Sequence, residues 1–129
     1  MKAALISAVL VGLGGSVGAL ARFGLSGLVH RFLPQTTFPL GTLAVNMLGC
    51  LAIGSIAGLA ESRLAFGPEL RAFVLIGILG SFTTFSTFGF ETFAMLRDDE
   101  YLRAITNIGL QVVLGLALVW FGYSLAATR

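Results

Sequence analysis

Charged residues are scarce in this sequence, and their scarcity argues against the commonest class of protein. Asp, Glu, Lys and Arg together make up 11% of the 129 residues, whereas hydrophobic residues make up 57%. A soluble domain carries about 25% charged residues, so this composition indicates a membrane protein. The basic residues stand singly along the chain, which gives no support to a patch that binds nucleic acid.

Cysteine and histidine each occur once. Because Cys50 has no second cysteine to pair with, an internal disulfide is excluded and packing as a small apolar residue is expected. His30 lies near the end of the first apolar stretch, where a polar tip at the membrane interface is favoured over metal ligation. No GxxxxGK loop occurs, so no nucleotide is expected.

The sequence contains four long stretches without charged residues. Each is long enough for a membrane-spanning helix of about 20 residues. The stretches without Asp, Glu, Lys or Arg are 3–21, 32–60, 72–90 and 104–128. We therefore predict an all-α membrane protein with a single domain over residues 1–129 and no extramembrane domain. The predicted spans are 3–31, 40–60, 70–96 and 101–127.

The first apolar stretch also imitates a cleavable signal peptide. Lys2 precedes an apolar run, and Ala19-Leu20-Ala21 resembles a cleavage site. The apolar character continues through Val29, and three further spans follow. A retained first helix is therefore the favoured interpretation. The Gly12-x-Gly14-x-x-x-Gly18 run lies inside this same stretch, so a dinucleotide-binding loop is not expected.

The basic residues do not decide the orientation in the membrane. Four spans place both termini on one side, and the positive-inside rule needs an excess of basic residues on one side. The terminal side would hold Lys2, Arg63, Arg71 and Arg129, and the other side Arg31, Arg97 and Arg103, with Arg22 near that end. Either other signals set the orientation, or the chain inserts both ways and pairs as an antiparallel homodimer. Four helices enclose little volume, so a solute path is expected to need a second copy.

Small residues recur at a spacing of four in the first two spans. Gly14 with Gly18, and Gly54 with Gly58, are pairs of the type that lets helix backbones approach closely in membranes. These pairs predict close helix packing.

The third stretch alternates hydroxyls with aromatic rings from Gly80 to Phe88. Lipid offers no water to these hydroxyls, so they are expected to face protein, a cavity or an ion path. Glycine and hydroxyls together predict a break in the helix near Gly80–Thr84. Broken membrane helices expose carbonyls that can coordinate a cation. The alternative is an intact helix whose Ser and Thr hydroxyls bond back to the preceding turn.

Polar or aromatic pairs lie on one face of three spans. The pairs are Thr42 with Asn46, Phe85 with Phe88, and Asn107 with Gln111. Spacings of three or four residues put both members on the same helix face. The pairs indicate either a solute path or hydrogen bonds that hold the bundle together.

The chemistry of these groups favours a small anion. Phenyl edges are weakly positive, and amide and hydroxyl groups donate hydrogen bonds. Arg22 and Glu91 lie near span ends, where they can snorkel or serve a vestibule. No carboxylate lies within the first span, which argues against a proton-coupled exporter of cationic drugs.

The order and spacing of these residues resemble the Fluc/CrcB family of fluoride channels, and the resemblance covers nearly the whole chain. The matching segments are Gly14-Gly15-x-x-Gly18-Ala19-x-x-Arg22, Gly41-Thr42-Leu43-x-Val45-Asn46-x-x-Gly49 and Gly80-x-x-Thr83-Thr84-Phe85-Ser86-Thr87-Phe88-x-x-Glu91. The Thr-Phe-Ser-Thr-Phe run is the most specific of them. Asn107 and Gln111 depart from the family's usual residues but keep their polarity.

The resemblance implies a dual-topology, antiparallel homodimer with two fluoride pores. It implies that Phe85 and Phe88 meet fluoride with their ring edges and that Asn46 points its amide into the pore. Other residues of the implied fluoride pathway are Ser86, Thr87, Thr42, Asn107, Gln111, Arg22 and Glu91. It also implies one structural Na⁺ at the dimer centre, held by the backbone carbonyls of Gly80 and Thr83.

The predicted function is passive fluoride export across a bacterial-type inner membrane, without enzymatic activity. Fluoride, the lipid bilayer and a second copy of the chain are the expected partners, and nucleic acid and nucleotide are not expected. The competing hypotheses are a small proton-coupled multidrug exporter and a non-transporting subunit of a larger membrane assembly.

Overall fold

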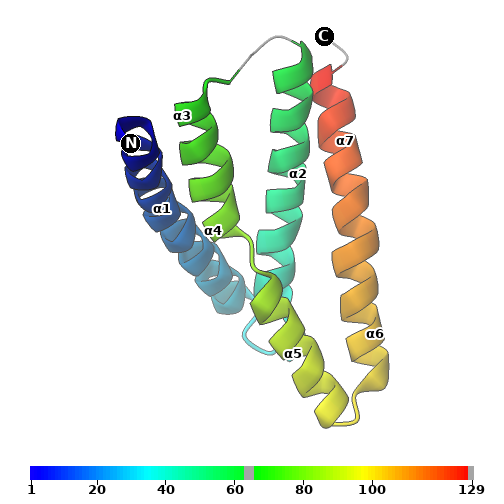
Figure 1. Ribbon diagram of the computed structural model, residues 1–129. Coiled ribbons are helices and arrows are strands. Elements are labelled where there is room, and N and C mark those ends of the chain that lie inside the picture. The colour runs from blue at the N-terminus through cyan, green and yellow to red at the C-terminus, as the bar shows by residue number, and fades with distance from the viewer. Residues whose placement is uncertain (63–65, 128–129) are drawn as a thin grey trace.

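The computed structural model describes residues 1–62 and 66–127. Within them the chain is all-helical and contains four helices long and apolar enough to cross a membrane, as predicted. Figure 1 shows the start of the first span and the end of the last at the same end of the bundle. Arg63 and Arg129, on which the predicted charge balance partly depends, lie outside the described residues.

The first two spans are continuous, and the last two are composed of several elements. α1 covers Lys2–Phe32 and α2 covers Leu40–Ser62. The third span comprises α3 (Pro68–Arg71), the π-helical η1 (Ala72–Leu79), α4 (Gly80–Phe82) and α5 (Phe85–Arg97). The fourth comprises α6 (Tyr101–Gly109), the π-helical η2 (Leu110–Leu114) and α7 (Gly115–Ala127).

Glycine allows α2 and α7 to pack with their backbones in contact. A Cβ atom on Gly54 would overlap the Val119 carbonyl, and one on Gly58 would lie 2.5 Å from the Tyr123 carbonyl oxygen. A Cβ on Gly122, from the other helix, would lie 2.5 Å from the Leu51 carbonyl oxygen. The predicted Gly54/Gly58 pair is therefore an interhelical contact.

The third span is broken where the sequence predicted. Thr83 and Thr84 adopt extended backbone conformations, with ψ angles of 160° and 113°, between α4 and α5. The Thr84 hydroxyl accepts a hydrogen bond from the Thr87 amide at 3.2 Å, so Thr84 caps the start of α5. The Thr83 hydroxyl donates back to the Leu79 carbonyl at 3.1 Å, yet the helix does not continue. The alternative of an intact helix is wrong.

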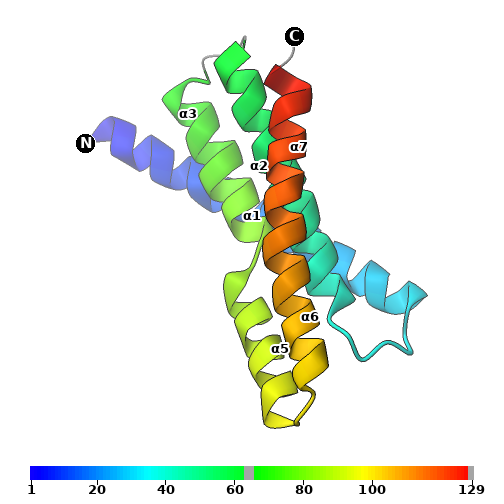
Figure 2. The same ribbon diagram turned by 90° about the vertical axis from the view of Figure 1, so that its right-hand side faces the viewer.

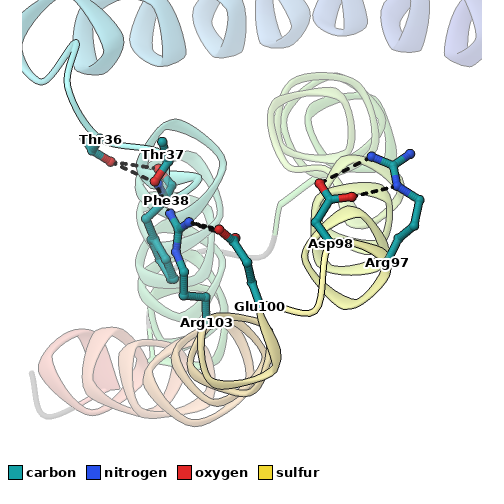
Figure 3. A network of polar contacts seen from close by, with 7 residues as sticks. All are labelled: Thr36, Thr37, Phe38, Arg97, Asp98, Glu100 and Arg103. Carbon is teal, nitrogen blue, oxygen red and sulfur yellow. Dashed lines mark hydrogen bonds and ion pairs between the residues drawn. The ribbon is translucent and has the colours of Figure 1, made fainter.

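A charged connection links α5 to α6 and reaches the loop before α2 (Figure 3). Arg97 pairs with Asp98 at 2.9 Å and Arg103 pairs with Glu100 at 2.7 Å. Hydrogen bonds from Arg97 lower the pKa of the Asp98 carboxyl. Arg103 also donates to the Thr37 hydroxyl, which fastens the loop between α1 and α2 to the start of α6.

Few side chains are enclosed within a single chain. Val45 and Asn107 are the largest fully buried side chains among the described residues, whereas large apolar residues on every span are exposed. An exposed apolar exterior is what lipid or a second copy would cover.

Candidate functional site

A cavity of about 420 Å³ lies at the break of the third span. Its walls come from α2, η1, α4, α5 and η2, so three spans contribute to it. Six of the predicted site residues line it: Asn46, Gly80, Thr83, Phe85, Phe88 and Gln111. The structure therefore brings the predicted aromatic pair, the predicted cation ligands and two polar residues to one place.

At the break, Asn46 forms hydrogen bonds with both backbone groups of Thr84. The Asn46 Oδ1 accepts from the Thr84 amide at 2.9 Å, and the Asn46 Nδ2 donates to the Thr84 carbonyl at 3.1 Å. The same Nδ2 donates to the Gln111 Oε1 at 3.0 Å. Both amide hydrogens of Asn46 are thus engaged within the chain. Thr84 is extended and loses its helical hydrogen-bond partners, and Asn46 replaces them. Every backbone polar group within the membrane must be bonded inside the protein, and Asn46 meets this requirement for Thr84.

The two phenylalanine rings meet edge to face. Their centroids are 5.5 Å apart with an interplanar angle of 63°. Phe88 is half-buried, whereas the side chain of Phe85 is 82% exposed in the single chain. Both rings line the cavity, and the exposure of Phe85 shows that the cavity is open where this ring lies.

Ser86 and Thr87 are exposed and do not line the cavity. They lie in the first turn of α5, around the hydroxyl of Thr84. That hydroxyl donates to the Thr87 hydroxyl at 2.9 Å and lies 3.4 Å from the Ser86 hydroxyl. The three hydroxyls form a short polar strip beside the ring pair.

The break also takes the helical amide partner from two carbonyl oxygens. Because the Thr84 amide donates to Asn46, the Gly80 carbonyl loses the amide that would bond it in a continuous helix. The Thr87 amide donates to the Thr84 hydroxyl, so the Thr83 carbonyl loses its helical partner too. The Arg22 Nη1 donates instead to that Thr83 oxygen at 3.5 Å. The described residues contain no cluster of three or more His, Cys, Asp and Glu side chains, so the oxygens this site offers a cation are those of the backbone and of neutral side chains.

Thr42 and Glu91 form a second polar contact, away from the break. The Thr42 hydroxyl donates to the Glu91 Oε1 at 2.7 Å, and the Glu91 Oε2 is buried without a partner among the described residues. Both residues line a smaller cavity of about 200 Å³, together with His30. Thr42 and Asn46 thus both face the third span, one at Glu91 and the other at Thr84.

Comparison with known proteins identifies the family. The family model described as CrcB-like protein, camphor resistance (CrcB), matches residues 9–123. The chain belongs to the CrcB-like family. A fluoride-specific ion channel FluC from Nitratidesulfovibrio vulgaris is 50% identical over 114 residues, covering 88% of this chain and 91% of that protein. The FluC proteins of Methylobacillus flagellatus and Hydrogenovibrio crunogenus are each 46% identical, covering 91% and 88% of this chain and 91% and 86% of those proteins.

The predicted family is therefore confirmed, and this CrcB-like chain is a multi-pass membrane protein. Two positions that the structure ties to the predicted site residues were not themselves predicted as site residues. Thr84 is the residue whose backbone bonds to Asn46, and a threonine directly before the start of α5 is the N-cap signal that identifies it. Thr92 is the partner of Asn107, which donates to the Thr92 hydroxyl at 2.9 Å.

Asn107 lies away from the cavity at the break. Its side chain is fully buried between α6 and α5, and it lines none of the cavities described above. Gln111, one turn later, does line the cavity at the break, and its Nε2 is buried without a partner among the described residues. Of this predicted pair, only Gln111 reaches the site.

Proposed function

We propose that this protein is a fluoride-selective channel that lets fluoride leave the cell down its electrochemical gradient. The observation that carries the proposal is the 50% identity, over 88% of the chain, to a relative named a fluoride-specific ion channel. The cavity at the break supports it, because its lining combines ring edges with amide groups and hydroxyls.

The lining suits an anion that must shed water and leave again quickly. The positive edges of Phe85 and Phe88, with neutral donors beside them, would replace the hydration shell of a small halide. None of the residues that line the cavity carries a full charge. A lysine or arginine there would bind fluoride too tightly for rapid release. Arg22, at the edge of the break, would attract anions without holding them inside.

The working channel is proposed to be an antiparallel homodimer with two pores. The cavity has an open side, and the exposed ring of Phe85 stands there. A second copy that covers this side would complete the path with its own helices. The near-equal numbers of basic residues at the two ends favour insertion in both orientations.

We further propose that one structural Na⁺ joins the two copies. The carbonyls of Gly80 and Thr83 lack their helical amide partners and fit an oxygen-seeking cation. Two carbonyls from each copy would supply four ligands. When bound, the ion would fasten the two breaks to each other.

Export by this route needs no ATP. Hydrogen fluoride crosses membranes as a neutral acid and ionises inside the cell, and a negative interior then drives the anion outward. Such export requires a channel that spans the inner membrane, and we place this protein there.

The two competing hypotheses fit the site less well. No acidic residue lies in α1 to exchange protons for a cationic drug. An assembly subunit would use its polar groups to join helices, as Asn107 and Thr92 do. Phe85 and Phe88 line a cavity instead and are not explained by that role.

Fluoride efflux from liposomes that contain only this protein tests the proposal. Vesicles loaded with potassium fluoride are treated with valinomycin, and external fluoride is followed with an electrode. We expect rapid release of fluoride and, in matched vesicles loaded with chloride, almost none of chloride. No fluoride release would favour an assembly subunit, and equal release of both halides would overturn the proposed selectivity. A proton-dependent exchange of cationic dyes would instead indicate the multidrug exporter.

A further inference from the structure

α1 and η1 cross at a point where both helices lack side chains. A Cβ atom on Gly77 would lie 2.9 Å from the Gly14 Cα, and one on Gly14 would overlap the Phe73 carbonyl. Glycine therefore sets a very short distance between the helices at this crossing. From the crossing toward the start of α1, the two helices diverge (Figure 2). The close contact continues at Gly18, where a Cβ atom would overlap the Ile78 carbonyl, so the helices leave a wedge only on the side toward the start of α1.

A cavity of about 470 Å³ lies in this wedge. Ser7 and Val11 line it from α1, and Ala72, Leu75 and Ile76 line it from η1. The walls are therefore almost wholly apolar. Leu75 also borders the cavity at the break, but that cavity has α2 as its opposite wall, whereas the wedge has α1. The two cavities thus lie against different neighbours of η1.

The wedge has a single charged lining residue, and it is a cation close to one end of the third span. Arg71 lines the wedge three residues after the third span begins at Pro68. Its side chain is exposed, and the ion pairs among the described residues do not include it. Glu69, the nearest acidic residue along α3, does not line the wedge. An apolar slot that ends in an unpaired arginine is complementary to a lipid with an acyl chain and an anionic headgroup.

We propose that the wedge between α1 and η1 binds one anionic phospholipid. An acyl chain would lie between the two helices, and Arg71 would hold the phosphate and headgroup at the surface. A lipid suits this place better than a second copy of the chain. The residues that the proposed second copy would meet, Gly80, Thr83 and Phe85, line the other cavity, on the α2 side of η1. The proposal does not depend on which ion the protein conducts.

Native mass spectrometry of the purified protein tests the site. The protein in detergent is titrated with phosphatidylglycerol or with phosphatidylcholine that carries the same acyl chains, and bound lipids are counted by mass. We expect one lipid per chain, with phosphatidylglycerol bound more tightly. One arginine near a membrane surface is worth about a fivefold difference in affinity. Equal affinity for the two lipids would overturn the role of Arg71.

Three variants separate the charge from the wedge. Arg71→Gln should lose the preference for phosphatidylglycerol, and Arg71→Lys should retain most of it. Arg31→Gln, which removes an exposed arginine at the end of α1 outside the wedge, should leave the preference unchanged. If Arg71→Gln keeps the preference or Arg31→Gln loses it, anionic lipid binds elsewhere.

Filling the wedge tests its occupant. Val11→Trp should reduce binding of both lipids while circular dichroism shows unchanged helix content. The same mass spectra report the oligomer. If Val11→Trp abolishes the dimer and leaves lipid binding intact, a second copy occupies the wedge and the proposal is wrong.

Discussion

At the scale of single residues, Asn46 decides whether the break can exist in lipid. It satisfies both backbone groups of Thr84. Asn46→Leu would leave those two groups unbonded, and each buried, unpaired group costs about 1–3 kcal/mol. We expect a loss of about 2–6 kcal/mol in the free energy of unfolding, measured by denaturant titration in mixed micelles. Gln111→Met, which removes only one of the three bonds to Asn46, is the matched control and should cost about 1 kcal/mol or less. Equal losses for both variants would contradict the role assigned to Asn46.

Phe85 is the residue whose replacement should stop transport without harming the fold. Its ring is 82% exposed in the single chain and lies at the open side of the cavity. Phe85→Ile keeps the apolar volume but removes the polarised ring edge. We expect fluoride efflux from liposomes to fall at least about tenfold, while size-exclusion chromatography shows the same oligomer. Phe90→Ile serves as the control, because Phe90 is similarly exposed on α5 but does not line the cavity. Wild-type flux in Phe85→Ile would remove the ring pair from the mechanism.

At the scale of elements, the start of α5 depends on the Thr84 cap. Thr84→Val is nearly isosteric but leaves the Thr87 amide without its side-chain acceptor. Loss of an N-cap costs about 1 kcal/mol. We expect that loss of stability together with faster hydrogen–deuterium exchange in the first turn of α5. Thr106→Val removes an exposed hydroxyl that bonds back to the Leu102 carbonyl and should change neither. Unchanged exchange at Thr87 would show that the cap does not stabilise this end.

The elements also show how far a sequence of this kind can be interpreted. The four spans and the break near Gly80–Thr84 were predictable, because lipid requires every backbone group to be satisfied within the protein. The partner of the break was not, because Asn46 meets Thr84 across 38 positions of sequence, and that register depends on how α2 packs against the third span. The same limit applies to Asn107. Its spacing from Gln111 predicted a shared face, but Asn107 donates to Thr92 on α5 and only Gln111 lines the cavity.

At the scale of the whole molecule, the open side of the cavity and the near-equal numbers of basic residues at the two ends both favour an antiparallel dimer. The orientation of the chain in the membrane tests it. If the chain inserts both ways, a cysteine at either end of the bundle faces outward in half of the copies. On a Cys50→Ala background, Lys2→Cys at the start of α1 and Asp98→Cys directly after α5 place single thiols at opposite ends of the bundle, as the positions of these elements in Figure 1 show. Labelling of intact cells with a membrane-impermeant maleimide should modify about half of each variant, and lysis should complete both reactions. A chain with one fixed orientation would instead give full labelling at one position and none at the other. That result would contradict the antiparallel dimer. It would also contradict the proposed Na⁺ site with four carbonyl ligands, because Gly80 and Thr83 of one copy supply only two.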